Sequence, residues 1–293
     1  MLGHKLWQTL TPGFDTYATV RRAPSGYAHF GIFDEARMVG GVFAEEFETV
    51  KRAFETVRPE VVINCIGIVK QDAAARNPLA SITINSLFPH QVAQACGEIG
   101  ARLIHLGTDC VFSGAKGNYS ESDSSDARDL YGRTKALGEV DEADYEDCLT
   151  LRTSMIGREL QSSHGLVEWF LSQRGKTVRG FKRAVFSGFT TQELAAVITD
   201  LIAEQPQLRG VWHVAAEPIN KFDLLLLLKE AFAVDIEIEP DETFVCDRSL
   251  NGERFRQATG FVPRPWPEMI EGMAPDTTPY DEIRDQIRRN DAG

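Results

Sequence analysis

The stretch Leu103-Ile104-His105-Leu106-Gly107-Thr108-Asp109-Cys110-Val111-Phe112 joins a short apolar run to a polar loop. An apolar run of this length, followed by a loop, predicts a buried strand over 103–106. The loop then lies at the carboxyl end of a sheet, which is where open α/β folds bind ligands. Thr108 could therefore hydrogen-bond a substrate carbonyl, although ordinary loop chemistry is the better explanation of this segment taken alone.

Similar apolar runs alternate with amphipathic stretches through the first half of the chain. This alternation predicts an α/β fold with a doubly wound, Rossmann-like parallel sheet over residues 1–155. The periodicity is less regular afterwards, and residues 156–293 predict a smaller α/β substrate-binding region. We expect strands at 15–20, 61–66, 103–106, 149–153 and 210–214 and near Val178 and Val185, and helices at 44–57, 85–100, 166–173, 192–204 and 224–228 and from Tyr131 onward. The polar tail, 275–293, is expected to be a terminal helix or partly disordered.

Composition and charge exclude several classes of partner. The 293 residues include 43 acidic and 31 basic side chains, for a net charge of -12. This charge repels nucleic-acid backbones and anionic membrane surfaces, so neither is an expected partner. We find no apolar run long enough to span a bilayer and no secretory signal, so the cytoplasm is the expected location. The five scattered cysteines are expected to be reduced thiols.

A second motif, Tyr131-Gly132-Arg133-Thr134-Lys135, follows the polar loop. Residues four apart on a helix share a face, so the Tyr131 phenol and the Lys135 ammonium are predicted to lie close together. A nearby ammonium favours the phenolate and lowers the pKa of the phenol towards the range in which it exchanges protons near neutral pH. This arrangement suits carbonyl reduction, although the same spacing also arises by chance on solvated helices.

A third segment, Asn64-Cys65-Ile66-Gly67, ends the strand predicted before 103–106. It is expected at the same carboxyl edge of the sheet, where Gly67 would let a cofactor approach the backbone closely. Each segment alone has an ordinary explanation as a loop. Three such segments in chain order favour a functional site.

Together these residues resemble the extended short-chain dehydrogenase/reductase superfamily and, within it, the dTDP-4-dehydrorhamnose reductase family of nucleotide-sugar reductases. The resemblance covers most of the chain. Its segments are Met1-Leu2-Gly3, similar to the end of a glycine-rich cofactor loop, Asn64 to Gly67, Asn85, Thr108 to Gly114, Tyr119, Glu121, Asp123, Tyr131 to Lys135, Gly138-Glu139, Leu151 to Ser154 and Gly210 to Val214.

The resemblance implies an NAD(P)-dependent oxidoreductase. NADPH would deliver hydride to the C4 ketone of a 4-keto-6-deoxy sugar linked to a nucleoside diphosphate, in nucleotide-sugar and polysaccharide biosynthesis. Tyr131 would protonate the nascent alkoxide, Thr108 would hydrogen-bond the same oxygen, and Lys135 would hold the nicotinamide ribose and tune Tyr131. The remaining implied contacts are Gly3, Cys65, Ile66 and Gly67 with the cofactor, and Asp109, Cys110, Met155 and Lys70 with the substrate.

Arg21 and Arg22 follow what would be the second strand of the family fold. An acidic residue at this point would bind the ribose 2′-hydroxyl of NAD, whereas arginines suit a 2′-phosphate. NADPH is therefore favoured over NADH, the alternative being that the pair is a solvated basic turn. Some members of the family also use magnesium, but we find no carboxylate cluster in the sequence to assign to it.

The sequence departs from the family pattern in three places. It opens inside its own cofactor loop, at Gly3, so the first strand is expected to be missing, through a misplaced start or a truncated chain. The loss would leave two neighbouring strands without a partner and remove backbone N–H groups that contact the pyrophosphate. Cys110 replaces an aromatic residue, and Met155 stands where some relatives carry tryptophan, so the substrate is open.

Four further polar residues each have two interpretations. Lys70 and Gln71 could contact a sugar or diphosphate, but a surface lysine without a ligand role is the favoured interpretation. His105 and His213 lie in predicted apolar strands and are expected to be hydrogen-bonded core histidines, because Tyr131 already supplies the acid.

Two alternatives to a reductase stay open. An epimerase or dehydratase of the same superfamily is less favoured, because a dehydratase usually carries Glu where Cys110 follows Asp109. A non-catalytic NADP-binding regulatory subunit is favoured by the missing strand and opposed by Thr108, Tyr131 and Lys135. The oligomeric state is open, a homodimer being one option.

Overall fold

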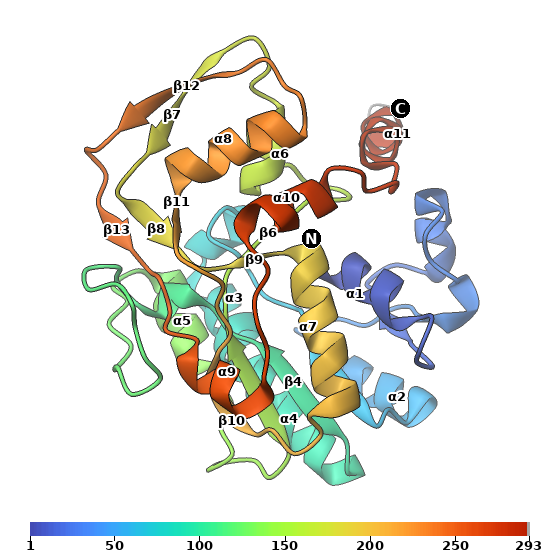
Figure 1. Ribbon diagram of the computed structural model, residues 1–293. Helices are drawn as coiled ribbons and strands as arrows, with labels where there is room; N and C mark the ends of the chain where they lie inside the picture. The colour runs from blue at the N-terminus through green and yellow to red at the C-terminus, as the bar shows by residue number, and fades with distance from the viewer. Residues whose placement is uncertain (292–293) are drawn as a thin grey trace.

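Four parallel strands form the central sheet of the protein in the computed structural model, which describes residues 1–291 (Figure 1). Their order is β10 (Gly210–His213), β5 (Cys148–Arg152), β4 (Arg102–Leu106) and β3 (Val61–Asn64). Every residue of β4 and β5 is buried, as expected where helices cover both faces of a parallel sheet. The predicted α/β fold with a parallel sheet is confirmed.

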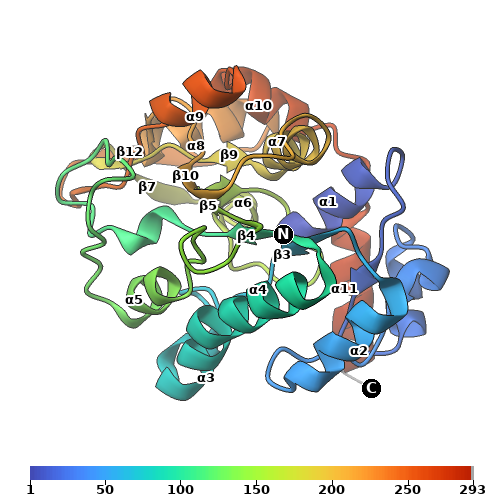
Figure 2. The ribbon, with the colours of Figure 1, turned by 90° about the horizontal axis from the view of Figure 1, so that it is seen from below.

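Alternate residues of the central strands face two different cores. In β4, Ile104 packs in the larger cluster with helices α1 (Leu2–Leu10) and α7 (Thr191–Glu204), whereas Leu103 packs in a second cluster with α4 (Phe88–Ile99). Figure 2 shows α4 on one side of β4 and β5, and α1 with α7 on the other. This two-sided burial is the doubly wound arrangement predicted from the alternating runs.

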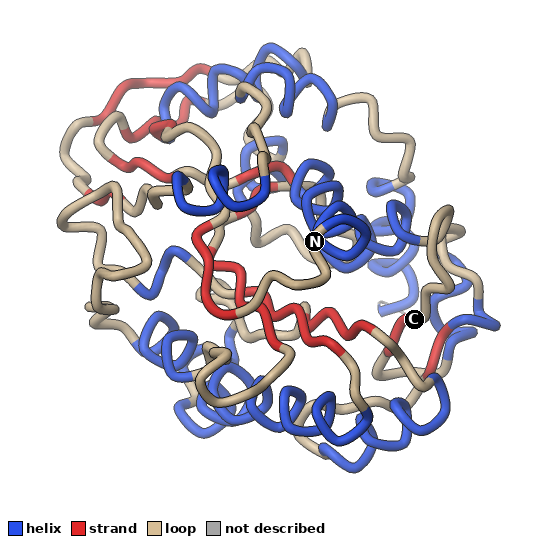
Figure 3. The backbone as a smooth tube through the Cα atoms, turned by 60° about the horizontal axis from the view of Figure 1, so that its bottom comes forward, coloured by secondary structure: helices blue, strands red, loops and turns tan. Residues whose placement is uncertain are grey.

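The sheet is interrupted beyond β3. Strands β1 (Ala18–Thr19) and β2 (Met38–Val39) pair in parallel with each other and form a separate sheet. Within residues 1–291, β1 and β3 each pair with one neighbour only, as expected if a strand is lacking between them. The first three residues of β3 are consequently only half-buried. Figure 3 shows the strands in red among the blue helices.

The second half of the chain adds small sheets and helices against the larger core. A parallel pair joins β7 and β12, another joins β6 and β9, and β8 lies between β11 and β13. Their bounds, with those of the remaining helices, are β6 Met155–Ile156, β7 Thr177–Phe181, β8 Ala184–Phe186, β9 Phe189–Thr190, β11 Ile219–Asn220, β12 Glu237–Asp241, β13 Cys246–Asp247, α2 Phe47–Val57, α3 Pro78–Ile82, α5 Leu130–Leu137, α6 Leu166–Leu171, α8 Lys221–Ala231, α9 Glu253–Thr259, α10 Trp266–Met273 and α11 Tyr280–Asp291.

Several helices and strands begin or end at residues other than those predicted. The strand expected at 15–20 is paired only at 18–19, and the helix expected from 44 begins at Phe47. The helix expected at 85–100 begins as a π-helical turn, Thr83–Leu87, and continues as α4. In the helix expected at 224–228, Leu224, Leu225 and Leu228 are buried, but Leu226 is 42% exposed. These shifts arise because pairing and packing partners outside the local sequence decide where an element ends.

The C-terminal tail packs on α1. The Asp276 carboxylate forms a 2.5 Å ion pair with Lys5 of α1 and accepts a 2.8 Å hydrogen bond from the Tyr280 hydroxyl. His4 Nε2 lies 2.8 Å from the same hydroxyl, and burial lowers the pKa of His4 to about 3. The tail is therefore an ordered helix, α11, as far as Asp291, and residues 292–293 lie outside the described part.

No helix between residues 1 and 291 is long and apolar enough to cross a bilayer.

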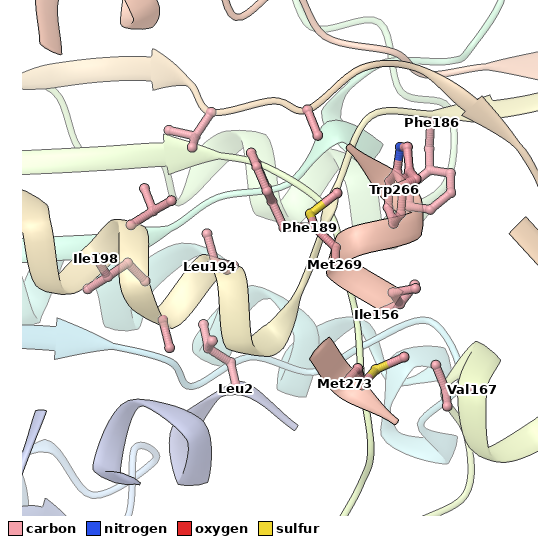
Figure 4. Close-up of a cluster of buried hydrophobic side chains, with 14 of the residues drawn as sticks. Leu2, Ile156, Val167, Phe186, Phe189, Leu194, Ile198, Trp266, Met269 and Met273 are labelled. Carbon is pink, nitrogen blue, oxygen red and sulfur yellow. The ribbon is translucent and has the colours of Figure 1, made fainter. Parts of the chain in front are cut away.

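Apolar side chains of α1 and α7 pack against each other in the larger core. Figure 4 shows Leu2 of α1 beside Leu194 and Ile198 of α7. Leu6, 4% exposed, belongs to the same cluster. We predict that Leu6→Ala lowers the free energy of unfolding by about 2–5 kcal/mol, because it leaves a cavity in this core.

Urea denaturation measures this change, with Leu79→Ala as the control, since Leu79 is 78% exposed. The control is expected within about 0.5 kcal/mol of the parent. Equal effects of the two substitutions would contradict the assignment of α1 to the core.

Candidate active site

Thr108 follows β4 at the carboxyl edge of the sheet, where the sequence predicts it. Its hydroxyl oxygen accepts a 3.1 Å hydrogen bond from the Cys110 backbone N–H and so caps a short 3₁₀ turn, Asp109–Val111. The same hydroxyl donates to Asp109 Oδ1 over 3.3 Å. Asp109 is 5% exposed, and burial raises the pKa of its carboxyl group. Cys110 is half-buried beside it.

Helix α5 brings Tyr131 to this turn. Asp129 caps the N-terminus of the helix, because its Oδ1 accepts a 2.9 Å hydrogen bond from the Gly132 N–H. Gly132 lies so close to the turn that a Cβ atom there would overlap the Cys110 carbonyl oxygen. The absence of a side chain at Gly132 thus allows Tyr131 to reach Thr108, whose hydroxyl hydrogen-bonds the phenol.

The Lys135 ammonium binds the carboxyl end of β4 rather than the Tyr131 phenol. Its ammonium donates a 2.7 Å hydrogen bond to the Leu106 carbonyl and lies 3.4 Å from His105 Nε2. Burial lowers the pKa of Lys135 to about 8. Burial, with the nearby Cys110 and Asp109, raises the pKa of the Tyr131 phenol. The prediction that Lys135 lowers the pKa of Tyr131 is therefore wrong here, because desolvation outweighs a charge that is directed at Leu106.

A π-helical turn at Asn85 fixes the other side of α5. Asn85 Oδ1 accepts from the Ile68 N–H over 2.8 Å, and its Nδ2 donates to the Ile68 carbonyl over 3.0 Å. The Ser86 hydroxyl donates to the Thr134 carbonyl over 2.8 Å. Gly138, just after α5, lies where a Cβ would overlap the Asn85 carbonyl. The loop after β3 and α5 are thereby tied to one turn.

The predicted cofactor residues of the first half meet at one place. Cys65 is exposed, and both the Met1 α-amino group and Lys135 lie within electrostatic range of it. Gly3, in the first turn of α1, is exposed, and a Cβ there would meet nothing within 4 Å. Ile66, whose N–H donates 3.0 Å to Asn64 Oδ1, and the exposed Gly67 continue the same loop.

Arg21 and Arg22 belong to a different part of the fold from these residues. Both are exposed and follow β1, which belongs to the separate two-stranded sheet. The structure therefore puts them after the predicted strand, with their guanidinium groups open to solvent.

The predicted substrate residues divide into two groups. Asp109 and Cys110 adjoin Thr108, and Lys70 pairs with Asp129 over 2.8 Å while its ammonium lies 5.8 Å from the centroid of the Tyr131 ring. Lys70 is thus an exposed lysine with neighbours at the site, and whether it contacts a ligand stays a prediction. Met155 is half-buried in β6 and packs against the larger core.

Two cations that the sequence analysis missed face the same turn. Lys221, at the first position of α8, and Arg248, after β13, both lie within electrostatic range of Asp109 and Cys110. They are more than 100 residues away in sequence and carry no motif. The one available signal was a lysine at the first position of a helix, the end at which the helix dipole disfavours a cation.

The two strand histidines are core residues, as predicted. His105 is fully buried, with Nδ1 3.1 Å from Asn64 Nδ2, and burial holds its pKa well below the usual value. His213 Nδ1 donates to the Tyr119 carbonyl over 2.9 Å, and its Nε2 accepts from Arg152 over 3.2 Å. Both side chains connect elements rather than present a free acid.

A stacked cluster anchors the long polar loop beside the site. The Phe112 and Tyr119 rings stack at 4.2 Å, and the Arg152 guanidinium lies 5.3 Å from the centroid of Phe112. Arg152 also forms two 2.7 Å hydrogen bonds with Glu139, just after α5. The family-like segments around these residues therefore hold the loop and α5 in place.

Across residues 1–291 we find no group of three or more His, Cys, Asp or Glu side chains arranged to hold a metal ion.

The close approach at Gly132 can be tested with one methyl group. We predict that Gly132→Ala lowers the free energy of unfolding by about 1–3 kcal/mol, because α5 must move away from Cys110. Gly97→Ala is the matched control, since Gly97 lies in helix α4 with open space around it. The control is expected to be neutral or stabilising by up to about 1 kcal/mol. Thermal denaturation measures both, and an equally stable Gly132→Ala would refute the tight contact.

The chain is similar in sequence and in fold to known proteins. The model of the RmlD substrate binding domain family matches residues 2–277. The chain is 35% identical over 135 residues to a dTDP-4-dehydrorhamnose reductase of Streptomyces griseus, covering 46% of this chain and 40% of that protein. It is 25% identical over 257 residues to the reductase of the same name from Salmonella typhimurium, covering 79% and 85%.

A solved structure extends the comparison to the fold. A dTDP-4-dehydrorhamnose reductase from Bacillus anthracis, in complex with NADP, superposes with a TM-score of 0.69 at 18% identity, covering 88% of this chain and 98% of that one. The predicted resemblance to the dTDP-4-dehydrorhamnose reductase family is confirmed by the family model and by these relatives. Because the family model spans nearly the whole sequence, the chain belongs to the RmlD substrate binding domain family.

Proposed function

We propose that the protein reduces the C4 ketone of a nucleotide-linked 4-keto-6-deoxy sugar with NADPH. The observation that carries this proposal is the meeting of Thr108, Tyr131 and Lys135 at the carboxyl edge of β4. Relatives named dTDP-4-dehydrorhamnose reductase, and a similar fold that binds NADP, support it.

The chain's own residues fit a nicotinamide cofactor. Gly3 leaves open space at the first turn of α1, and Cys65 and the Lys135 ammonium lie within electrostatic range of each other. Exposed backbone at a helix N-terminus suits a pyrophosphate, and an ammonium suits ribose hydroxyls. NADPH, when bound, supplies the hydride.

Tyr131 acts as the acid. Burial keeps the phenol protonated at neutral pH, so that it donates its proton to the ketone oxygen as this becomes an alkoxide. Thr108 hydrogen-bonds the same oxygen. The resulting phenolate is buried, and the Thr108 hydroxyl stabilises it until a proton from solvent restores the phenol, while the Lys135 ammonium holds the nicotinamide ribose.

One observation favours a second candidate. The sheet is interrupted between β1 and β3, and this interruption favours a non-catalytic NADP-binding regulatory subunit. An epimerase or dehydratase has no comparable support, because Cys110 rather than Glu follows Asp109.

Substitution of Tyr131 tests the proposal. Turnover of a 4-keto-6-deoxy sugar nucleotide, followed by NADPH absorbance, is expected to fall about 100-fold or more in Tyr131→Phe, because the proton donor is removed. Tyr17→Phe, at a tyrosine that is 44% exposed, is expected to be unchanged. Turnover that survives Tyr131→Phe would refute the mechanism. Parent protein that binds NADPH but reduces no 4-keto sugar would support the regulatory subunit.

The pH dependence of turnover follows from Lys135. The lysine is cationic below its pKa of about 8, so kcat is expected to fall as the pH rises through this value. In Lys135→Arg the cation persists, and the fall near pH 8 is expected to disappear even if the rate is lower. Lys221→Met should keep the fall, although burial lowers the pKa of Lys221 to about 8 as well. A fall retained in Lys135→Arg would contradict this assignment.

Cofactor preference depends on Arg21 and Arg22. NADPH is expected to bind more tightly than NADH, since the exposed guanidinium groups suit a 2′-phosphate. Replacing both arginines with alanine should weaken NADPH binding about tenfold and leave NADH binding unchanged. Nucleotide fluorescence titration measures both, with Arg133→Ala, an exposed arginine on α5, as the control. An equal loss for both cofactors would contradict the role of the pair.

A further inference from the structure

The His105 imidazole lies between two side chains that both present N–H groups to it. Asn64 Nδ2, at the end of β3, is 3.1 Å from its Nδ1, and the Lys135 ammonium of α5 is 3.4 Å from its Nε2. His105 is fully buried, and burial holds its pKa well below the usual value, so the ring is neutral. A neutral imidazole has one acceptor nitrogen and one N–H group. It can therefore accept a hydrogen bond from only one of these two neighbours.

A backbone contact decides which neighbour this is. Asn64 Oδ1 accepts a 3.0 Å hydrogen bond from the Ile66 backbone N–H, a group that can only donate. Exchanging the oxygen and nitrogen of the Asn64 amide would set two donors against each other. Asn64 Nδ2 therefore donates to His105 Nδ1. This makes Nδ1 the acceptor and leaves the ring proton on Nε2.

This tautomer turns an N–H group toward the Lys135 ammonium. The ammonium is 5% exposed and already donates to the Leu106 carbonyl over 2.7 Å. A protonated Nε2 accepts no hydrogen bond from it, whereas the lone pair of a neutral lysine amine would accept one from Nε2–H. A contact that favours the neutral form lowers the pKa of a lysine. It acts in the same direction as burial, which lowers the pKa of Lys135 to about 8.

The other titratable groups near this contact are few in the part of the chain that the structure describes. Glu139, after α5, and Cys65, after β3, both raise the pKa of Lys135 and so oppose the effect of His105. The Glu139 carboxylate also forms two 2.7 Å hydrogen bonds with Arg152 of β5. On the far side, His90 of α4 lies within electrostatic range of His105.

We propose that His105, held with its proton on Nε2 by Asn64, is a positioning residue that sets the pH at which Lys135 loses its charge. No proton passes through the imidazole, which acts as a fixed hydrogen-bond donor. The consequence for turnover rests on the proposed function. The tautomer of His105 and the acidity of Lys135 do not depend on it.

Nitrogen-15 NMR of the folded protein reads the tautomer without turnover. Long-range ¹H–¹⁵N spectra of protein with labelled histidine separate a protonated ring nitrogen from an unprotonated one. His105→Gln identifies the His105 signals among the six histidines by their loss. We expect a protonated Nε2 and an unprotonated Nδ1 at neutral pH. A protonated Nδ1 in the parent protein would overturn the inference.

Asn64→Asp provides a second variant with a different prediction. A carboxylate accepts from both the Ile66 N–H and the ring, so the His105 proton is expected to move to Nδ1. This shift also identifies the His105 signals if His105→Gln does not fold. A tautomer that stays the same in Asn64→Asp would show that Asn64 does not hold it.

The acidity of Lys135 is measured by carbon-13 NMR of the lysine side chains as the pH is raised. Lys135→Arg identifies the signal by its loss. In His105→Gln an amide oxygen can accept from the ammonium, so the pKa of Lys135 is expected to rise by about 1 or more, and the fall in kcat should move with it. His105→Leu offers no acceptor, and its Lys135 pKa is expected to stay below that of His105→Gln.

His213→Gln is the matched control. His213 is also a fully buried strand histidine whose ring nitrogens are hydrogen-bonded. The pKa of Lys135 is expected to stay at the parent value in this variant. A Lys135 pKa that is equal in the parent and in His105→Gln would overturn the inference, because the parent imidazole would then already accept from the ammonium.

The inference and the proposed function fail separately. A reductase whose His105 carries its proton on Nδ1 loses only the inference. A protein with the expected tautomer and the expected rise in the pKa of Lys135, but with no ketone reduction, loses only the reductase assignment.

Discussion

The hydrogen bond from the Lys135 ammonium to the Leu106 carbonyl connects the two elements on which the site depends. It spans 2.7 Å and ties α5 to the last residue of the central strand β4. A buried ammonium needs such a partner, because its desolvation otherwise costs free energy and favours loss of its proton. Thr108, two residues after Leu106, and Tyr131, four residues before Lys135, are thereby brought to the same edge.

Two glycines permit this arrangement. Gly132 lets α5 approach the Cys110 carbonyl, and Gly138 lets the chain after α5 pass the Asn85 carbonyl. Around them, the Arg152–Glu139 pair and the stacked Phe112 and Tyr119 rings hold the adjoining loop. The chemistry assigned to Tyr131 therefore rests on packing that is shared by several segments far apart in the sequence.

Much of the central fold could be predicted from local pattern. Strands β3, β4 and β5 are short apolar runs followed by polar loops, and parallel strands bring their carboxyl ends to one edge, which is why Thr108 and the segment Asn64 to Gly67 were expected together. The meeting of Thr108 with Tyr131 was expected from the family resemblance. The partner of Lys135 could not be predicted, because a backbone carbonyl leaves no mark in the sequence. Nor could the pKa of Tyr131, since its burial depends on neighbours such as Cys110 that come from another element.

Long-range contacts explain the other failures. Lys221 and Arg248 reach the site from distant strands, and neither belongs to a motif. The tail from Asp276 to α11 has a polar sequence, yet it packs on α1, because Lys5 pairs with Asp276 and His4 lies within hydrogen-bond distance of Tyr280. The interrupted sheet, in contrast, was expected from the resemblance.

Deuterium transfer from labelled NADPH tests the central claim most directly. The protein would be incubated with a 4-keto-6-deoxy sugar nucleotide and NADPH carrying deuterium at nicotinamide C4, and the product would be analysed by mass spectrometry and NMR. The account predicts one deuterium per product molecule, at sugar C4, when the label is on the transferred face. Product without deuterium at C4, with either face labelled, would contradict it.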